Sequence, residues 1–220
     1  MTCAILAHCA ETGQLGVAVV SALIAVTGRC AFVQAQVGAV AVQSMADPRL
    51  GPAALKLLAS GYRPEAVIRA FARTEEGFDY RQVALINASG ATAVHNGRYV
   101  SGMDGAAEAE RCAAICNHLV DPEVPERMVE ACVRTQGELG VRLVAALHAA
   151  TADGGAGPVR AAGLLIAEHE SWPLVDLRVD WTEGDPVAEL EKLWRLWRPE
   201  MRNYLERALD PASVVGAERP

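Results

Sequence analysis

The apolar segments of this sequence come in blocks of one type: strands, two helices, strands, two helices, strands and a final helix. Apolar runs of strand type occupy residues 2–9, 14–21, 31–44, 81–88, 91–96, 111–117, 161–169 and 173–181. Helical patterns occupy residues 47–61, 63–77, 121–135, 140–155 and 185–210. Because strands and helices do not alternate singly, this order predicts an α+β protein. Its two stacked, mainly antiparallel sheets are flanked by helices, and a doubly wound parallel sheet is disfavoured.

Proline and glycine mark the expected ends of several helices. The Asp-Pro pairs at 47–48, 121–122 and 185–186 each supply a capping residue and a first-turn proline. The helix at 140–155 is expected to end at its two final glycines, Gly154 and Gly155.

The C-terminal region is expected to be separate from the main domain. We predict one domain over residues 1–182, an amphipathic helix over 183–210 and a flexible tail over 211–220. Pro199 should kink or split that helix. Its apolar stripe of leucines and tryptophans predicts packing on the domain or on a partner subunit, hence a homodimer or higher homo-oligomer.

Charge and composition exclude several classes of function. The formal net charge of −7 disfavours a nucleic-acid-binding surface, which is normally basic. The sequence contains no run of 18 apolar residues, the length that a membrane helix needs, so no membrane partner is expected. The start lacks the basic region of a signal peptide. The six cysteines are then expected to be reduced thiols in a cytoplasmic protein.

The spacing of the cysteines and histidines does not predict a metal site. Cys112, Cys116, His118 and Cys132 form a C-x3-C-x-H pattern with a distant fourth residue, whereas structural zinc needs four convergent ligands. P-loop, GxGxxG, HExxH and GxSxG motifs are absent from the sequence. We therefore expect neither a metal nor a cofactor.

Thr2 follows Met1 directly and opens the first apolar run. Removal of Met1 would place a hydroxyl and a free α-amine on one residue. Such a nucleophile, with its own amine as general base, is one solution to amide hydrolysis. The amine titrates near pKa ~7.7–8.0, close to the range that suits a general base. An ordinary strand start is the alternative interpretation.

Five separated blocks of the sequence resemble one known family. The opening MTCAILAHCAETGQLGVAV is similar to the family's MTFSIVARDPETGELGVAV, and YRQVALINASGATAVHNG to its YRQVAVVDAQGRVAAHTG. Further blocks are QVGAVAVQSMADPRLG, ICN at residues 115–117 and VDLRVDWTEGDPVAEL. Together they resemble domain of unknown function 1028, whose members have an Ntn-hydrolase-like fold, over roughly residues 2 to 195.

This resemblance implies a four-layer αββα sandwich and Thr2 as the N-terminal nucleophile. It predicts a hydrolase of a small linear or cyclic amide that needs no cofactor. The sequence departs from the family pattern at Ala4, His8, Cys9, Ile115–Cys116 and the VRAAG segment at 159–163, where the family has polar or glycine-rich residues. The alternative is therefore a non-catalytic relative that binds a small molecule or has a structural role in an oligomer.

Other candidate site residues lie at the ends of the apolar runs. Asn117 is a candidate oxyanion donor. Ser21 and Gln43 match family positions where a hydroxyl or an amide could contact a substrate, and Gln82 could do the same. For each of these residues, a hydrogen bond that closes a strand end or a turn is the structural alternative.

His95 and Arg178 are two further candidates for substrate binding. His95 ends a strand before Gly97 and could orient a substrate or move a proton. Arg178 could bind a substrate carboxylate with its forked guanidinium, and it shares a strand face with Asp176 and Asp180. The alternatives are a structural histidine and a surface ladder of ion pairs.

Overall fold

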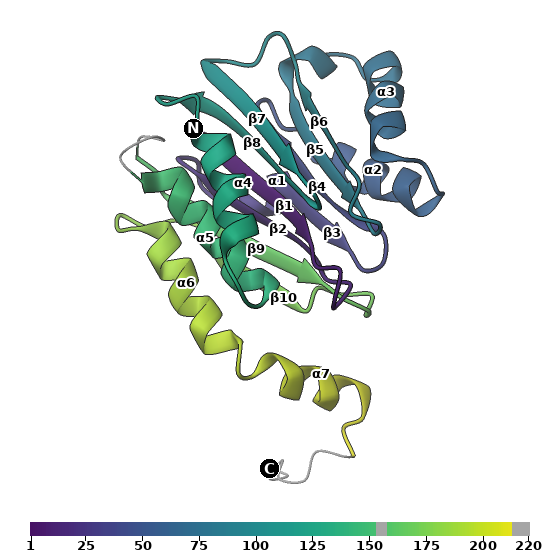
Figure 1. Cartoon of the computed structure of the whole chain (residues 1–220), viewed down its shortest axis with the longest axis vertical. Coiled ribbons are helices and arrows are strands. Elements are labelled where there is room, and N and C mark those ends of the chain that lie inside the picture. The colour runs from purple at the N-terminus through teal and green to yellow at the C-terminus, as the bar shows by residue number, and fades with distance from the viewer. Residues whose placement is uncertain (153–157, 213–220) are drawn as a thin grey trace.

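Two antiparallel sheets lie face to face in the computed structural model, which describes residues 1–152 and 158–212. The larger sheet has the strand order β10-β9-β2-β1-β8-β7, and the smaller has the order β3-β4-β5-β6. Every neighbouring pair of strands is antiparallel. Helices cover the outer face of each sheet (Figure 1), so the predicted four-layer αββα sandwich is confirmed.

The strands follow the predicted segments closely. In the larger sheet they are β1 (Thr2–His8), β2 (Leu15–Ser21), β7 (Met103–Ala109), β8 (Cys112–Leu119), β9 (Ala161–Ala167) and β10 (Val175–Val179). In the smaller sheet they are β3 (Ala31–Gln34), β4 (Gly38–Gln43), β5 (Gln82–Asn87) and β6 (Thr92–Asn96).

The helices divide between the two outer layers. Those in the described part of the chain are α1 (Thr27–Cys30), α2 (Leu50–Ala59), α3 (Pro64–Thr74), α4 (Val124–Arg134), α5 (Leu139–Thr151), α6 (Pro186–Trp197), α7 (Met201–Leu209) and the 3-10 turn η1 (Phe78–Tyr80). Figure 1 shows α2 and α3 against the smaller sheet and α4, α5 and α6 against the larger one.

Three hydrophobic cores follow from this layering. One lies between the larger sheet and its helices, one between the two sheets, and one between the smaller sheet and its helices. The side chains of β1 alternate between the first two cores: Cys3 and Ile5 face the helices, whereas Ala4 and Leu6 face the other sheet. All seven residues of β1 are therefore buried, which explains why its sequence is a continuous apolar run.

Three local predictions were incomplete or wrong. β7 was missed because MDGAAEA carries small and acidic residues on a half-exposed edge strand, without a clear apolar alternation. The single run at 31–44 is a hairpin of β3 and β4, and the turn-like TGRC before it is the four-residue helix α1. Asp47 lies before α2, which begins only at Leu50.

The C-terminal helix begins and breaks where the sequence indicated. Asp185 caps α6 by accepting hydrogen bonds from the backbone N–H of Val187 at 2.8 Å and of Ala188 at 3.1 Å. Pro199 lies between α6 and α7, and α7 extends away from the sheets (Figure 1). The helix end predicted at Gly154 and Gly155 lies outside the described residues, as does most of the predicted tail, and the domain division remains a prediction.

None of the helices within residues 1–152 and 158–212 is both long and apolar enough to cross a membrane.

Candidate functional site

Five buried polar side chains meet between the two sheets at one end of the sandwich. The larger sheet supplies Thr2, Ser21 and Asn117, and the smaller sheet supplies Gln43 and Gln82. Thr2 is 8% exposed and the other four are at most 3% exposed. Within each sheet they are direct neighbours, because Thr2 pairs with both Ser21 and Asn117, and Gln43 pairs with Gln82.

The alternation of side chains along each strand explains why all five point inward. The residues two positions further into the sheets are apolar and belong to the core between the sheets: Ala4, Val19, Ile115, Ala41 and Ala84. Because strand side chains repeat every two residues, the polar residues at the strand ends face the same interior. The apolar core between the sheets therefore ends in a polar cluster.

The hydroxyl groups of Thr2 and Ser21 are in direct contact. Thr2 Oγ1 lies 2.9 Å from Ser21 Oγ. The backbone N–H of Ala22 donates to Met1 O at 3.1 Å. Thr2 and Ser21 are therefore a non-hydrogen-bonded pair of the antiparallel ladder, the arrangement in which opposing side chains come closest. The ladder itself fixes the contact between the two hydroxyls.

A network of amide groups joins the two sheets below Thr2. Gln43 Nε2 donates to Thr2 O at 3.1 Å, to Gln82 Oε1 at 3.0 Å and to Ile115 O at 3.2 Å. Because all three partners are acceptors, the nitrogen of Gln43 must face them. Asn117 Nδ2 donates to the same Gln82 Oε1 at 3.0 Å. Gln43 Oε1 is buried and has no partner among the described residues.

Thr2 and Asn117 line a cavity of about 450 Å³. Ser21, Gln43, Met1, Arg29 and His118 also line it. Arg29 Nη2 donates to Ile24 O at 2.8 Å, and Arg29 forms no ion pair within the described ranges. Among the described residues no carboxylate lines the cavity, and the permanent side-chain charge that they supply there is the positive charge of Arg29.

The backbone at the cavity mouth is strained. Ser44, Met45 and His118 line the cavity and have φ angles of 53°, 51° and 51°. Residues other than glycine rarely adopt this left-handed region, which costs about 1–2 kcal/mol. Such strain is concentrated at binding and catalytic sites, where the surrounding structure holds it.

Burial also affects the amino group at the start of the chain. Desolvation lowers the pKa of the Met1 ammonium below its ordinary value, although the nearby Cys3 thiol opposes this shift. Near pH 7 an amine at this place is therefore neutral more often than a solvated one, and so more often free to accept a proton.

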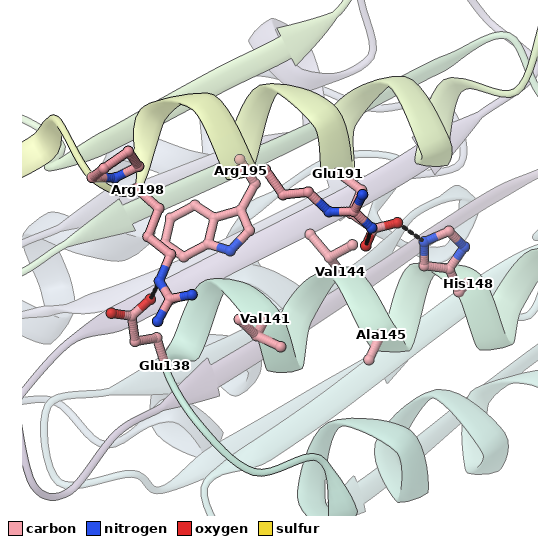
Figure 2. A pocket seen from close by; sticks show the side chains of 10 residues that line it. Glu138, Val141, Val144, Ala145, His148, Glu191, Arg195 and Arg198 are labelled. Atoms are coloured by element: carbon pink, nitrogen blue, oxygen red, sulfur yellow. Dashed lines mark hydrogen bonds and ion pairs between the residues drawn. The ribbon is translucent and has the colours of Figure 1, made fainter.

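Larger cavities elsewhere lack this combination of groups. One of about 550 Å³ lies between α5 and α6 (Figure 2). Its charged side chains pair with each other: Glu191 contacts His148 at 3.1 Å, and Arg198 contacts Glu138 at 2.6 Å. Another of about 830 Å³ lies beside His8, at the opposite end of β1 from Thr2.

The structure does not bring His95 into the cluster. On β6, Val94 packs toward the core between the sheets, so His95 points to the opposite face. There its ring stacks on Phe78 with centroids 4.1 Å apart, and its Nε2 lies 3.3 Å from Phe78 O. The inward-facing residue is Asn96, whose Oδ1 accepts from Gln82 Nε2 at 2.9 Å. The structure therefore brings Asn96, and not His95, into the cluster.

Arg178 also lies apart from the cavity. It belongs to the edge strand β10, which β9 and β2 separate from β1. Arg178 Nε and Nη2 donate to the two carboxylate oxygens of Asp176 at 2.6 and 2.8 Å. This forked pair raises the pKa of Arg178 and occupies the guanidinium group with a neighbour on its own strand.

Sequence reasoning missed the cavity residues that come from irregular segments. Arg29 belongs to the unpredicted helix α1, and His118 is the last residue but one of β8; both line the cavity. Asn96 had a usable signal, since it occupies the position two residues after Val94.

No group of three or more His, Cys, Asp or Glu side chains within the described ranges is arranged to hold a metal ion. Cys112, Cys116 and Cys132 all belong to the core between the larger sheet and its helices. Burial raises the pKa of the Cys116 thiol, so this group is held in its neutral form.

Comparison with known proteins identifies the family of this chain. Its sequence matches the model of a family of unknown function, DUF1028, over residues 2–190. The structure is similar to that of protein SPO2555 from Silicibacter pomeroyi, a DUF1028 protein. The TM-score is 0.83, with 29% identity over 89% of this chain and 88% of that chain. Anbu (ancestral beta-subunit) from Yersinia bercovieri gives a TM-score of only 0.40 at 12% identity, covering 100% of both chains. No curated protein matches the sequence. The chain belongs to the DUF1028 family.

Proposed function

We propose that this protein hydrolyses a small linear or cyclic amide with Thr2 as an N-terminal nucleophile, after removal of Met1. The observation that carries the proposal is the position of the Thr2 hydroxyl. It is buried in a polar cluster, contacts Ser21 Oγ at 2.9 Å and lines a cavity of about 450 Å³. A terminus packed in hydrocarbon or far from any cavity would have excluded this chemistry.

The reaction needs only groups that the cluster contains. After Met1 removal, Thr2 Oγ1 attacks the carbonyl carbon of the substrate and the α-amine takes up the hydroxyl proton. The tetrahedral oxyanion accepts a hydrogen bond from Asn117 Nδ2, which lines the cavity and is already oriented by Gln82. The C–N bond breaks, the amine leaves with a proton, and water hydrolyses the ester on Thr2. The αββα architecture agrees with the Ntn-hydrolase-like fold that the family resemblance implied.

The polar groups of the cavity support a substrate of a particular kind. Gln43 Oε1 is a buried acceptor without a donor, and such a group is unfavourable until it is paired. A primary or secondary amide carries the N–H group that can pair with it. Arg29 supplies an unpaired positive charge in a cavity without carboxylates, which favours an amide that also carries a negative group.

The non-catalytic alternative rests on the polar groups that this chain has lost. None of the departures from the family pattern is a residue that lines the cavity. His8 and Cys9 lie at the far end of β1, and Cys116 faces the helices of the outer layer. Ala161, within the VRAAG segment, pairs with Ser21 across the β2–β9 ladder. Ile115 and Cys116 take part in the cluster only through their backbone carbonyls, so none of the lost side chains belonged to a residue that lines the cavity.

The decisive experiment combines intact-mass measurement with an electrophilic β-lactone probe. The purified protein should lack Met1, and the probe should add one acyl group, which peptide mapping should place on Thr2. Thr2→Ala should abolish the addition while keeping the melting temperature, and Thr2→Ser should retain it. Full retention of Met1, or labelling that is unchanged in Thr2→Ala, would refute the proposal. A screen of small acidic amides should then separate an enzyme from a binding protein.

A further inference from the structure

The hydroxyl of Ser21 has three hydrogen-bond partners, and together they fix the direction of each bond. The backbone N–H of Leu23 lies 3.1 Å from Ser21 Oγ, Met1 O lies 3.1 Å away and Thr2 Oγ1 lies 2.9 Å away. A serine hydroxyl donates once and accepts twice. Leu23 can only donate and Met1 O can only accept, so the proton of Ser21 points at Met1 O. Thr2 must then donate its own proton to Ser21.

Met1 therefore fixes the direction of both hydrogen bonds: Thr2 donates to Ser21, and Ser21 donates to the Met1 carbonyl. The proton of Ser21 is committed to the Met1 carbonyl, so Ser21 has no acceptor to which it could pass a proton onward. Thr2 N is at the same time an amide nitrogen without a basic lone pair. With Met1 present, the Thr2 proton has a partner but no route to a base.

Removal of Met1 changes both ends of this chain of bonds. The carbonyl that accepted the Ser21 proton leaves with Met1, and the nitrogen bonded to that carbonyl carbon becomes the free amine of Thr2. Ser21 is fully buried while Met1 is in place, so its proton needs a new acceptor once the Met1 carbonyl is gone. The new lone pair on Thr2 Nα lies where the acceptor was lost, and rotation about the Cβ–Oγ bond of Ser21 turns its proton toward the amine.

We infer that Ser21 relays the proton between Thr2 Oγ1 and Thr2 Nα, and that removal of Met1 switches this relay on; the inference rests on the function proposed above. As Thr2 Oγ1 forms its bond to the substrate carbonyl carbon, its proton passes to Ser21 Oγ. The original proton of Ser21 passes to Thr2 Nα, which becomes an ammonium. When the C–N bond breaks, the Thr2 ammonium gives its proton to the leaving nitrogen, and Thr2 Nα returns to the neutral amine. Ser21 ends each transfer as a neutral hydroxyl.

The relay solves a geometric problem of this kind of nucleophile. A proton that moves directly from the hydroxyl of Thr2 to its own amine closes a small ring in which the hydrogen bond is strongly bent. Hydrogen bonds weaken steeply as they bend below about 120°. A path through Ser21 Oγ widens the ring and straightens both bonds. Ser21 is thus placed as a proton relay in addition to the substrate-contact role expected from the sequence.

The test follows acylation of Thr2 by the β-lactone probe, which needs no natural substrate. We expect Ser21→Ala to slow acylation at least tenfold and to change its pH profile, because water must then replace the relay. Ser21→Thr, which keeps the hydroxyl, should restore much of the rate. Ser60→Ala removes a hydroxyl of α2's C-terminal end, outside the cavity, and serves as the matched control. Melting temperatures establish that each variant is folded.

Two measurements on the unsubstituted protein keep the inference testable if Ser21→Ala fails to fold. In mixtures of H₂O and D₂O, the acylation rate should depend on deuterium fraction along a curve, as expected when two protons move together. A straight dependence would contradict the relay. A form with an N-terminal extension that retains Met1 should not react at Thr2, and reaction at an undiminished rate would contradict control by Met1.

The outcomes separate this inference from the proposed function. If Thr2 is acylated in the unsubstituted protein and Ser21→Ala reacts at the same rate with the same pH profile, the relay is wrong while Thr2 remains the nucleophile. If the mature protein is not acylated at Thr2, the proposed function fails and the relay fails with it.

Discussion

Gln43 and Gln82 face each other across the β4–β5 ladder, and Gln43 Nε2 donates to Gln82 Oε1 at 3.0 Å. The same two amides also reach the other sheet: Gln43 donates to Thr2 O at 3.1 Å, and Gln82 donates to Cys116 O at 2.9 Å. The pair therefore ties β1 and its neighbour β8 to the smaller sheet. Two polar side chains at strand ends, Gln43 and Gln82, thus connect the two sheets at the candidate site.

The first prediction concerns the stability that Gln82 provides. Gln82→Met keeps the length of the side chain but leaves Asn117 Nδ2 without its acceptor and Cys116 O without the Gln82 donor, whereas Gln43 Nε2 keeps Thr2 O and Ile115 O as acceptors. Each unpaired buried group costs about 1–3 kcal/mol, so we expect the free energy of unfolding to fall by about 3 kcal/mol. Urea titration measures this. The exposed Gln136→Met is the control, with an expected change within about 0.5 kcal/mol. A comparable loss in both variants would contradict the interpretation.

The second prediction concerns the pH dependence of Thr2. Burial lowers the pKa of the Met1 ammonium, and Thr2 lies deeper, so its free amine should also titrate below the ordinary value of about 8. Because only the neutral amine can accept a proton, the acylation rate should rise with pH and level off below about pH 8. The pH profile of β-lactone acylation tests this. A rate that continues to rise well above that pH would contradict a desolvated amine.

The third prediction concerns the charge of the substrate. Arg29 is exposed at the cavity and unpaired, so its attraction for a carboxylate is about 1 kcal/mol, equivalent to roughly fivefold. Arg29→Gln should slow acylation by a carboxylate-bearing β-lactone about fivefold at low salt and leave the matching carboxamide probe unaffected. Raising the salt concentration should reduce this difference. Arg73→Gln, on the exposed side of α3, is the control; equal effects of the two substitutions would argue against a role for Arg29.

The fourth prediction concerns His95 as a structural residue. Burial is the main cause that lowers its pKa, outweighing the opposing hydrogen bond to Phe78. Above about pH 6.5 His95 is neutral in both states and contributes no pH dependence. Below that pH the unfolded chain binds a proton that the folded chain resists, so the free energy of unfolding falls.

His95→Gln should therefore reduce the loss of stability between about pH 7 and pH 5, because it removes one group that binds a proton more weakly in the folded than in the unfolded chain. Urea unfolding at the two pH values measures the slope. Burial, reinforced by the nearby Arg111 charge, also lowers the pKa of His8, so part of the slope should remain. An unchanged slope in His95→Gln would show that this histidine titrates alike in the folded and unfolded states.

The sequence predicted the fold and most of the candidate cluster for one physical reason. In a sandwich of two buried sheets, each strand appears in the sequence as an apolar run. Polar residues at the ends of these runs therefore lie at the ends of the core between the sheets. Thr2, Ser21, Asn117, Gln43 and Gln82 all satisfy that pattern, and the structure brings them together.

The errors arose where that pattern carries no information. His95 and Asn96 are both polar, so their order along the strand does not tell which one faces inward until Val94 is placed in the core. β7 lacks the apolar residues that would reveal a strand. Arg29 reaches the cavity through a four-residue helix whose position depends on the tertiary structure.

The hydrogen bonds of Gln43 have a consequence for the reactivity of Thr2. Since Gln43 Nε2 contacts both the backbone of Thr2 and the side chain of Gln82 on the other sheet, any sliding of one sheet over the other would shift Thr2 relative to its cavity. Ala41 and Ala84 form part of the layer over which such sliding would occur, and both are completely buried. A larger side chain at either position would have to push the sheets apart or displace them. An enlarged side chain at either alanine should therefore disturb the alignment of a hydroxyl it never touches.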